Sequence, residues 1–220
     1  MEYKRLTIVC GHYGTGKSNV AVNMALDLKK QHNKVVLADL DIVNPYFRSV
    51  DSADELKNHG IRIICSDYAN SNVDIPALPS DIYSIVDNKD EKAVLDVGGD
   101  DRGALVLGRL TPKILEENDY NMLMVINCYR PLTKDALSTI EVMREIEDAA
   151  HIKFTGFINN SNLGEETTEQ CIIDSFKYVD DITNATNLPV FATTVKEDIY
   201  LSLKNKYDNL FPIKLQKKIF

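Results

Sequence analysis

A glycine-rich segment near the start of the chain has the residue types and spacing of a phosphate-binding loop. Residues 11–18 read GHYGTGKS and satisfy the pattern G-x-x-x-x-G-K-[ST], directly after an apolar run and directly before a helical pattern. Glycines let backbone N–H groups wrap phosphate oxygens, and a lysine ammonium group reaches the β- and γ-phosphates. The segment therefore predicts nucleotide binding through Gly11, Gly14, Thr15, Gly16, Lys17 and Ser18.

Two acid-rich clusters follow apolar runs and predict the rest of a phosphoryl-transfer site. Asp39 and Asp41 come after residues 35–38, and Asp96 and Asp100 come after residues 93–95. In a parallel sheet both clusters would emerge at the same edge as the phosphate loop. Asp96 suits the metal's coordination shell, whereas Asp41 and Asp100 compete for orienting the attacking water. Capping of turns and helix starts is the alternative explanation for each acid.

These roles give one predicted site. The expected catalytic residues are Lys17, Asp41 and Asp100, and the expected metal ligands are Ser18 and Asp96. The cofactors that follow are ATP and Mg²⁺.

Alternating apolar runs and helical patterns predict a doubly wound α/β fold of the P-loop NTPase type. Short runs rich in Val, Ile and Leu occur at residues 6–10, 35–38, 61–65, 93–97, 122–127, 154–159 and 189–193. Amphipathic helical patterns occupy residues 17–31 and 134–149. We expect a mostly parallel sheet of about seven strands flanked by helices, in a single domain over residues 1–220. Residues 67–79 predict a surface loop that leads into a short helix.

The composition narrows the classes of function. With 44% hydrophobic and 26% charged residues the chain is typical of a globular domain, and its net charge of −8 argues against nucleic-acid binding through a broad basic surface. The first residues contain neither a signal-peptide pattern nor a membrane span, so we expect a cytoplasmic protein. The four cysteines are far apart in sequence and are expected to be buried thiols, not ligands of zinc or of an iron–sulfur cluster. Residues 213–220 are basic and apolar, but their spacing is only partly helical and does not favour membrane attachment.

Together with the phosphate loop, three further segments resemble the MinD/ParA/Mrp group of P-loop ATPases, which includes the nitrogenase iron protein. They are DLDIVNP at residues 39–45, DVGGD at 96–100 and GFINN at 156–160. The resemblance implies a Mg²⁺-ATP-dependent homodimer that closes on nucleotide and opens after hydrolysis. It places Asp41 at the switch I aspartate and Asp96 at the acid near the metal, and it implies that Asn160 and Asp198 frame the adenine. Because the group consists of ATPases, the resemblance implies ATP in preference to GTP.

The sequence departs from this group at two points. Most members of the group carry a second lysine early in the phosphate loop, where this sequence has His12 and Tyr13. The resemblance would place that lysine against the phosphates of the partner subunit. A protonated histidine or one of Arg48, Arg102 and Arg130 could supply a cation instead, and the sequence leaves this open. The iron–sulfur cysteines of the group are also absent, and Gly103 stands at one of their positions, so cluster chemistry is not expected.

Three functions remain open at this point. The leading hypothesis is a Mg²⁺-dependent ATPase that acts as a dimeric nucleotide switch on an unknown protein or small-molecule partner. The first alternative is an ATP-dependent ligase or kinase of the dethiobiotin synthetase or cobyrinate amidase type, with residues 67–79 holding the acceptor. The second is an ATP-binding regulator with little hydrolysis, which would follow if no cation replaces the second lysine.

Overall fold

Parallel strands form a single sheet at the centre of the computed structural model, which describes residues 1–41, 53–65, 80–99 and 101–215. In these ranges the sheet has eight strands in the order β3-β2-β4-β1-β5-β6-β7-β8, and every neighbouring pair is parallel. The strands are β1 Leu6–Cys10, β2 Val35–Asp39, β3 Arg62–Cys65, β4 Lys92–Asp96, β5 Tyr120–Ile126, β6 Gly156–Asn159, β7 Val190–Lys196 and β8 Leu210–Ile213. Because all strands run the same way, the segments that follow them meet at one edge of the sheet.

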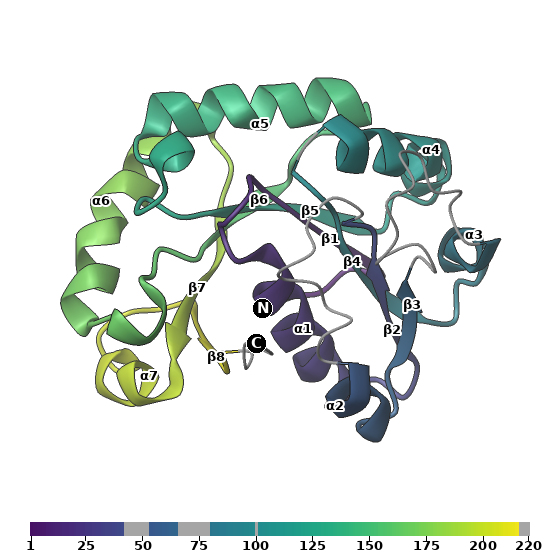
Figure 1. The fold of residues 1–220 in the computed structure, drawn as a ribbon, viewed down its shortest axis with the longest axis horizontal. Helices are drawn as coiled ribbons and strands as arrows, with labels where there is room; N and C mark the ends of the chain where they lie inside the picture. The colour runs from purple at the N-terminus through teal and green to yellow at the C-terminus, as the bar shows by residue number, and fades with distance from the viewer. Residues whose placement is uncertain (42–52, 66–79, 100, 216–220) are drawn as a thin grey trace, which may run out of the picture.

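Helices cover both faces of this sheet (Figure 1). They are α1 Lys17–Lys29, α2 Ala53–Asn58, α3 Ser80–Asp87, α4 Asp101–Glu117, α5 Ala136–Ala150, α6 Glu169–Thr186 and α7 Glu197–Leu203, with 3₁₀ turns η2 Pro131–Thr133 and η3 Gly164–Glu166. The core cluster on one face takes side chains from α3, α4, α5 and α6, and the cluster on the other face takes them from α1 and α2. This is the doubly wound arrangement that the alternation of runs and helical patterns predicts.

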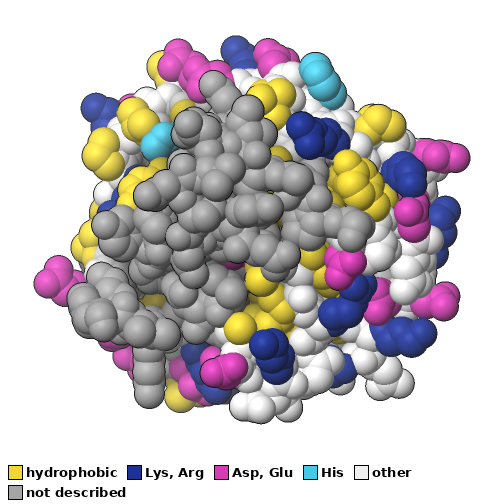
Figure 2. All heavy atoms as spheres, turned by 45° about the vertical axis from the view of Figure 1, so that its right-hand side comes forward, with side chains coloured by type: hydrophobic (Ala, Val, Ile, Leu, Met, Phe, Trp, Pro, Cys, Tyr) yellow, Lys and Arg dark blue, Asp and Glu magenta, His cyan; other side chains and the backbone are white. Residues whose placement is uncertain are grey.

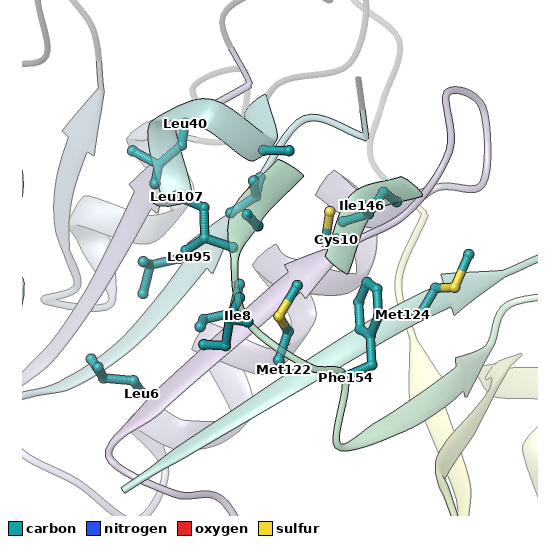
Figure 3. Packing of buried hydrophobic residues seen from close by; sticks show 14 of the residues in the cluster. Leu6, Ile8, Cys10, Leu40, Leu95, Leu107, Met122, Met124, Ile146 and Phe154 are labelled. Atoms are coloured by element: carbon teal, nitrogen blue, oxygen red, sulfur yellow. The ribbon is translucent and has the colours of Figure 1, made fainter. Parts of the chain in front are cut away.

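The central strands are buried on both faces, which explains their nearly continuous apolar sequences. All five residues of β1 are buried, and Ile8 and Cys10 pack on the face covered by α5 (Figure 3). Met122 and Met124 of β5 and Ile146 of α5 belong to the same core cluster (Figure 3). Burying both faces of β1 holds its carboxyl end, and the phosphate loop that follows it, on a rigid support.

Local signals set where the helices begin and end. The Asp135 side chain accepts a hydrogen bond from the Ser138 N–H at 2.9 Å and caps α5. Thr168 caps α6 in the same way through the Cys171 N–H. Both helices end at a residue in the left-handed conformation, His151 for α5 and Asn187 for α6. These stops keep the connections to β6 and β7 short.

The predicted elements are found where the sequence places them, and the structure adds the helices α2, α4, α6 and α7 and the strand β8. All seven predicted strands are present, and the helical patterns at residues 17–31 and 134–149 correspond to α1 and α5. The sequence does not predict β8, because Pro212 lies inside it and proline disfavours strands. The structure accommodates the proline because β8 is the last strand in the sheet order. Residues 67–79 lie outside the described ranges, and the short helix expected after them is α3.

The cysteines differ in part from expectation. Cys10 is buried, and burial raises the pKa of its thiol to about 12, so it behaves as a core residue. Cys65, Cys128 and Cys171 are only half-buried, so the expectation of buried thiols is wrong in degree for these three. All four are free thiols, and the described part of the chain contains no group of three His, Cys, Asp or Glu side chains arranged to hold a metal ion.

The helices and the surface charge bear on contact with membranes and partners. None of the helices in the described ranges has the length and apolar character needed to cross a bilayer. Figure 2 shows acidic and basic side chains interspersed over the described part of the face that it draws.

Candidate functional site

The phosphate loop connects β1 directly to α1. Gly14 and Gly16 have φ values of +79° and +86°, a region that side chains other than glycine rarely adopt. The Thr15 hydroxyl donates to the His12 carbonyl at 2.8 Å and closes the turn between these glycines. Gly16 is the N-cap of α1 and offers no side chain to cap it. The N-terminus of α1 therefore points its first N–H groups at the loop, as an anion site requires.

Lys17 forms a buried ion pair with Asp41. The distance between Lys17 Nζ and Asp41 Oδ2 is 2.7 Å, and the two side chains are 5% and 3% exposed. Burial alone would lower the pKa of Lys17, but the carboxylates of Asp41 and Asp96 outweigh it and raise the pKa above its usual value. The predicted lysine and the predicted water-orienting acid are therefore in direct contact.

The acids that follow β2 and β4 lie side by side. Asp39 and Asp96 are register partners in the parallel pairing of these strands. The Leu40 N–H donates to the Asp96 carbonyl at 2.8 Å, and the Asp41 N–H donates to Asp39 Oδ1 at 3.1 Å. These backbone bonds bring three carboxyl groups to the edge of the sheet where β1 enters the phosphate loop.

Asp96 is the most deeply buried of these acids. Burial, followed by the charge of Asp39, raises the pKa of Asp96 to about 8, against the opposing effects of Lys17 and Ser18. Both carboxylate oxygens are buried without a hydrogen bond of ordinary geometry, although the Ser18 hydroxyl is close enough to lower the pKa. A buried acid of this kind is stabilised in its charged form by a nearby cation.

These residues fit a magnesium ion. Mg²⁺ prefers oxygen ligands, and it commonly takes only one or two from the protein, with water and substrate phosphates completing its shell. Ser18 and Asp96 supply a hydroxyl and a carboxyl oxygen beside the phosphate loop. A site of this type does not require the cluster of three protein ligands that a structural metal centre would show.

Gly99 packs directly on the phosphate loop, a role that sequence reasoning missed. A Cβ atom added to Gly99 would clash with the Gly11 carbonyl oxygen and would lie 2.5 Å from the Gly11 carbonyl carbon and 3.0 Å from His12 Cα. The segment after β4 therefore crosses the loop at a distance that only glycine allows. The consecutive glycines of the DVGGD segment are the signal that could have revealed this approach.

Asn160 lies beneath the phosphate loop. Its side chain is buried, and its Nδ2 donates to the Thr15 carbonyl at 2.6 Å. Its Oδ1 accepts from Asn162 Nδ2 at 2.9 Å and from the Thr194 hydroxyl. The amide is thus engaged inside the protein, and the strands β6 and β7 are tied to the loop through it. The contact with adenine that the resemblance implies stays a prediction.

The other predicted residues differ in where they lie. Asp198 is exposed in the first turn of α7, directly after β7 and at the same edge of the sheet. Asp100 and Arg48 lie outside the described residues, and so does the side chain of Arg102. Arg130 lies beside Gly14, with its Nε 3.8 Å from the position that a Cβ on Gly14 would take. The described structure therefore brings together the phosphate loop, Asp41, Asp96 and Asn160.

Comparison with known proteins identifies a nucleotide-binding domain family. A family profile described as the CobQ/CobB/MinD/ParA nucleotide binding domain matches residues 6–210. A search of curated proteins found no match.

Solved structures with a similar fold include three forms of FtsY. The cell division protein FtsY of Thermotoga maritima has a TM-score of 0.58 at 15% identity, with 88% of this chain and 62% of that chain covered. The signal recognition particle receptor FtsY of Elizabethkingia anophelis, in complex with GDP, has a TM-score of 0.53 at 16% identity, with 90% and 60% covered. FtsY of Mycoplasma mycoides has a TM-score of 0.53 at 18% identity, with 90% and 63% covered. The chain spans less than two thirds of the length of these proteins, and the likeness is one of fold.

Proposed function

Because the chain belongs to the CobQ/CobB/MinD/ParA nucleotide-binding domain family and is a nucleotide-binding P-loop protein, we propose that it is a Mg²⁺-dependent ATPase. We propose further that it works as a homodimeric nucleotide switch on a partner whose affinity depends on the nucleotide. The observation that carries this proposal is the buried ion pair between Lys17 and Asp41.

This ion pair links phosphate binding to the end of β2. Removing one partner of a buried ion pair costs about 3–5 kcal/mol, so Lys17 leaves Asp41 only for another strong anion. A terminal phosphate is such an anion, and the loop at residues 11–18 presents its backbone N–H groups to it. Once Lys17 turns to the phosphate, the Asp41 carboxylate is released to accept a hydrogen bond from water. Arrival of the nucleotide thereby breaks a buried contact at the end of β2, and a contact that depends on the nucleotide is what a switch needs.

The same residues divide the chemistry of hydrolysis among them. Ser18 and Asp96 would hold Mg²⁺, which when bound neutralises phosphate charge and polarises the phosphoryl oxygens. Lys17 stabilises the charge on the terminal phosphate, and Asp41 orients the attacking water. Asp100 remains a second candidate for the water, and Asp198 and Asn160 remain the candidates that frame the base.

ATP is the proposed nucleotide because the chain resembles a group of P-loop ATPases. Residues 205–208 read NKYD and match the letters of the guanine signature Asn-Lys-x-Asp, but they lie between α7 and β8, ahead of a parallel strand and so at the edge of the sheet opposite the phosphate loop. One FtsY structure with a similar fold contains GDP, which makes GTP the competitor to test. Competition between ATP and GTP for the purified protein addresses this point. A preference for GTP would overturn the choice of nucleotide but not the proposal that the phosphate loop hydrolyses a nucleoside triphosphate.

Phosphate release is the direct test of the function. Wild type should release phosphate from ATP in the presence of Mg²⁺ and stop when EDTA removes the metal, and Lys17→Ala should be inactive. Lys30→Ala is a matched control, because Lys30 lies just beyond α1 with its side chain 74% exposed. Equal turnover in wild type and Lys17→Ala would exclude this site as the catalyst.

Two further readouts separate the alternatives. If labelled γ-phosphate appears on an added carboxylate and not in water, the protein is a ligase or kinase. If light scattering detects an ATP-dependent dimer without turnover, it is a binding regulator.

A further inference from the structure

Arg130 lies against the phosphate loop on the segment that follows β5. Its Nε and Cδ are 3.8 Å and 3.9 Å from the position that a Cβ on Gly14 would take, so the side chain lies beside Gly14 of the loop. The side chain is exposed, and among the described residues its guanidinium group forms no hydrogen bond or ion pair. A cation is thus held next to an anion-binding loop, and no anion in the described part of the chain neutralises it.

The backbone of Arg130 is held in place by a tight turn. The Arg130 N–H donates to the Asn127 carbonyl at 3.1 Å, and the Thr133 N–H donates to the Arg130 carbonyl at 3.1 Å. The Thr133 hydroxyl donates to the Asn127 carbonyl at 2.7 Å, and Pro131 begins the 3₁₀ turn η2. The turn therefore fixes where the arginine starts, while its long side chain keeps the freedom to reach an oxygen of a ligand.

The negative charge that gathers at the site would be stabilised by a cation beside the phosphate loop. Three carboxyl groups, those of Asp39, Asp41 and Asp96, gather where the phosphates would lie, and Lys17 is already paired with one of them. A triphosphate adds further negative charge to the same volume. Phosphate groups in proteins are stabilised by arginine in particular, because its planar fork of N–H donors matches two phosphate oxygens at once.

We propose that Arg130 contacts the phosphate oxygens of the nucleotide bound in its own phosphate loop and acts there as a second cation beside Lys17. This inference rests on the proposed function, because it needs a nucleotide in the loop. It names Arg130 as the residue that supplies the cation for which the sequence leaves several candidates. It also predicts that the contribution of Arg130 grows with the number of phosphates and does not depend on the base.

Binding of nucleotides that differ in phosphate number tests the proposal. Calorimetry would compare wild type, Arg130→Gln and Arg130→Lys with a nonhydrolysable ATP analogue, ADP and AMP, each with Mg²⁺. Arg130→Gln keeps a polar side chain of similar length and loses the charge, so its affinity for the analogue should fall about ten- to hundredfold, with a smaller loss for AMP. Arg130→Lys keeps the charge without the fork and should recover part of the affinity.

Arg144→Gln is the matched control, because Arg144 is an exposed arginine of α5. It should bind all three ligands like wild type. If Arg130→Gln binds the analogue as tightly as wild type, or loses affinity equally for the analogue and for AMP, Arg130 only packs on Gly14 and the proposal is wrong. In that case binding by wild type that is abolished in Lys17→Ala would leave the proposed function intact. If wild type itself does not bind the analogue, both the proposed function and this role of Arg130 are refuted.

Discussion

Substitution of Gly99 by alanine tests whether the segment after β4 supports the phosphate loop. The added Cβ would overlap the Gly11 carbonyl group and approach His12 Cα to 3.0 Å. Carbon atoms pack favourably at roughly 3.5–4.0 Å, so the two backbone segments must separate by about 1 Å or more. Overpacking of this kind costs about 1–3 kcal/mol, and contact with backbone, which cannot rotate away, places Gly99→Ala near the upper value.

The expected result is a loss of about 3 kcal/mol in the free energy of unfolding, measured by urea denaturation. For a chain of this size that loss lowers Tm by roughly 6–12 °C. Because the displaced atoms belong to Gly11 and His12, nucleotide affinity should fall as well, measured by calorimetry with the ATP analogue.

Gly108→Ala is the same chemical change at a site with space for it. A Cβ on Gly108 would lie 3.5 Å from the Ala149 carbonyl oxygen, which is ordinary contact, and Gly108 is inside α4. Alanine is favoured over glycine within helices by about 0.5–1 kcal/mol, so this variant should be as stable as wild type or slightly more stable. If Gly99→Ala and Gly108→Ala have equal stability and equal affinity, the close approach of the two segments does not exist and the reasoning fails.

Three other variants test the burial of Asp96, the support of the phosphate loop by Asn160 and the link between α1 and the backbone at Lys214. Since burial raises the pKa of Asp96 from 3.8 to about 8, the folded protein holds a proton that the unfolded chain releases, and the free energy of unfolding falls as pH rises between these values. The side chain of Asp96→Asn stays neutral at every pH, so the free energy of unfolding of this variant should fall less between about pH 5 and about pH 8, measured by urea titration without metal. An equally steep fall in the variant would contradict the raised pKa of the buried Asp96 carboxyl group. Asn160→Ala removes the buried donor to the Thr15 carbonyl and should cost about 1–3 kcal/mol of stability, whereas an unchanged urea midpoint would show that the loop does not depend on it. Asn23→Ala loses both hydrogen bonds that join α1 to the Lys214 backbone, at 3.0 Å and 2.9 Å. Amide hydrogen exchange at Lys214 should therefore become faster in this variant. Unaltered protection of that amide would refute the link.

The phosphate loop could be predicted because its determinants are contiguous. Glycines, lysine and serine stand at fixed spacing between an apolar strand and an amphipathic helix, and each of these signals is local. The seven predicted strands were equally readable, because central strands of a parallel sheet are apolar on both faces. The strand β8 escaped prediction because Pro212 breaks the local pattern, and only the end position of β8 in the sheet makes that proline acceptable.

The order of the strands decided the contacts within the site. Because β1 lies between β4 and β5, the segments after these two strands both reach the phosphate loop, and they bring Gly99 to Gly11 and Arg130 to Gly14. No local pattern in the sequence reports that order, since crossovers of similar length can join a strand to either side of the sheet.

The sequence by itself therefore determined that the chain has a phosphate loop with acids at neighbouring strand ends, because spacing and apolar periodicity are properties of short segments. The tertiary structure alone decided that Lys17 pairs with Asp41 and that Arg130 lies on the loop, because these contacts depend on how distant segments meet at one edge of the sheet.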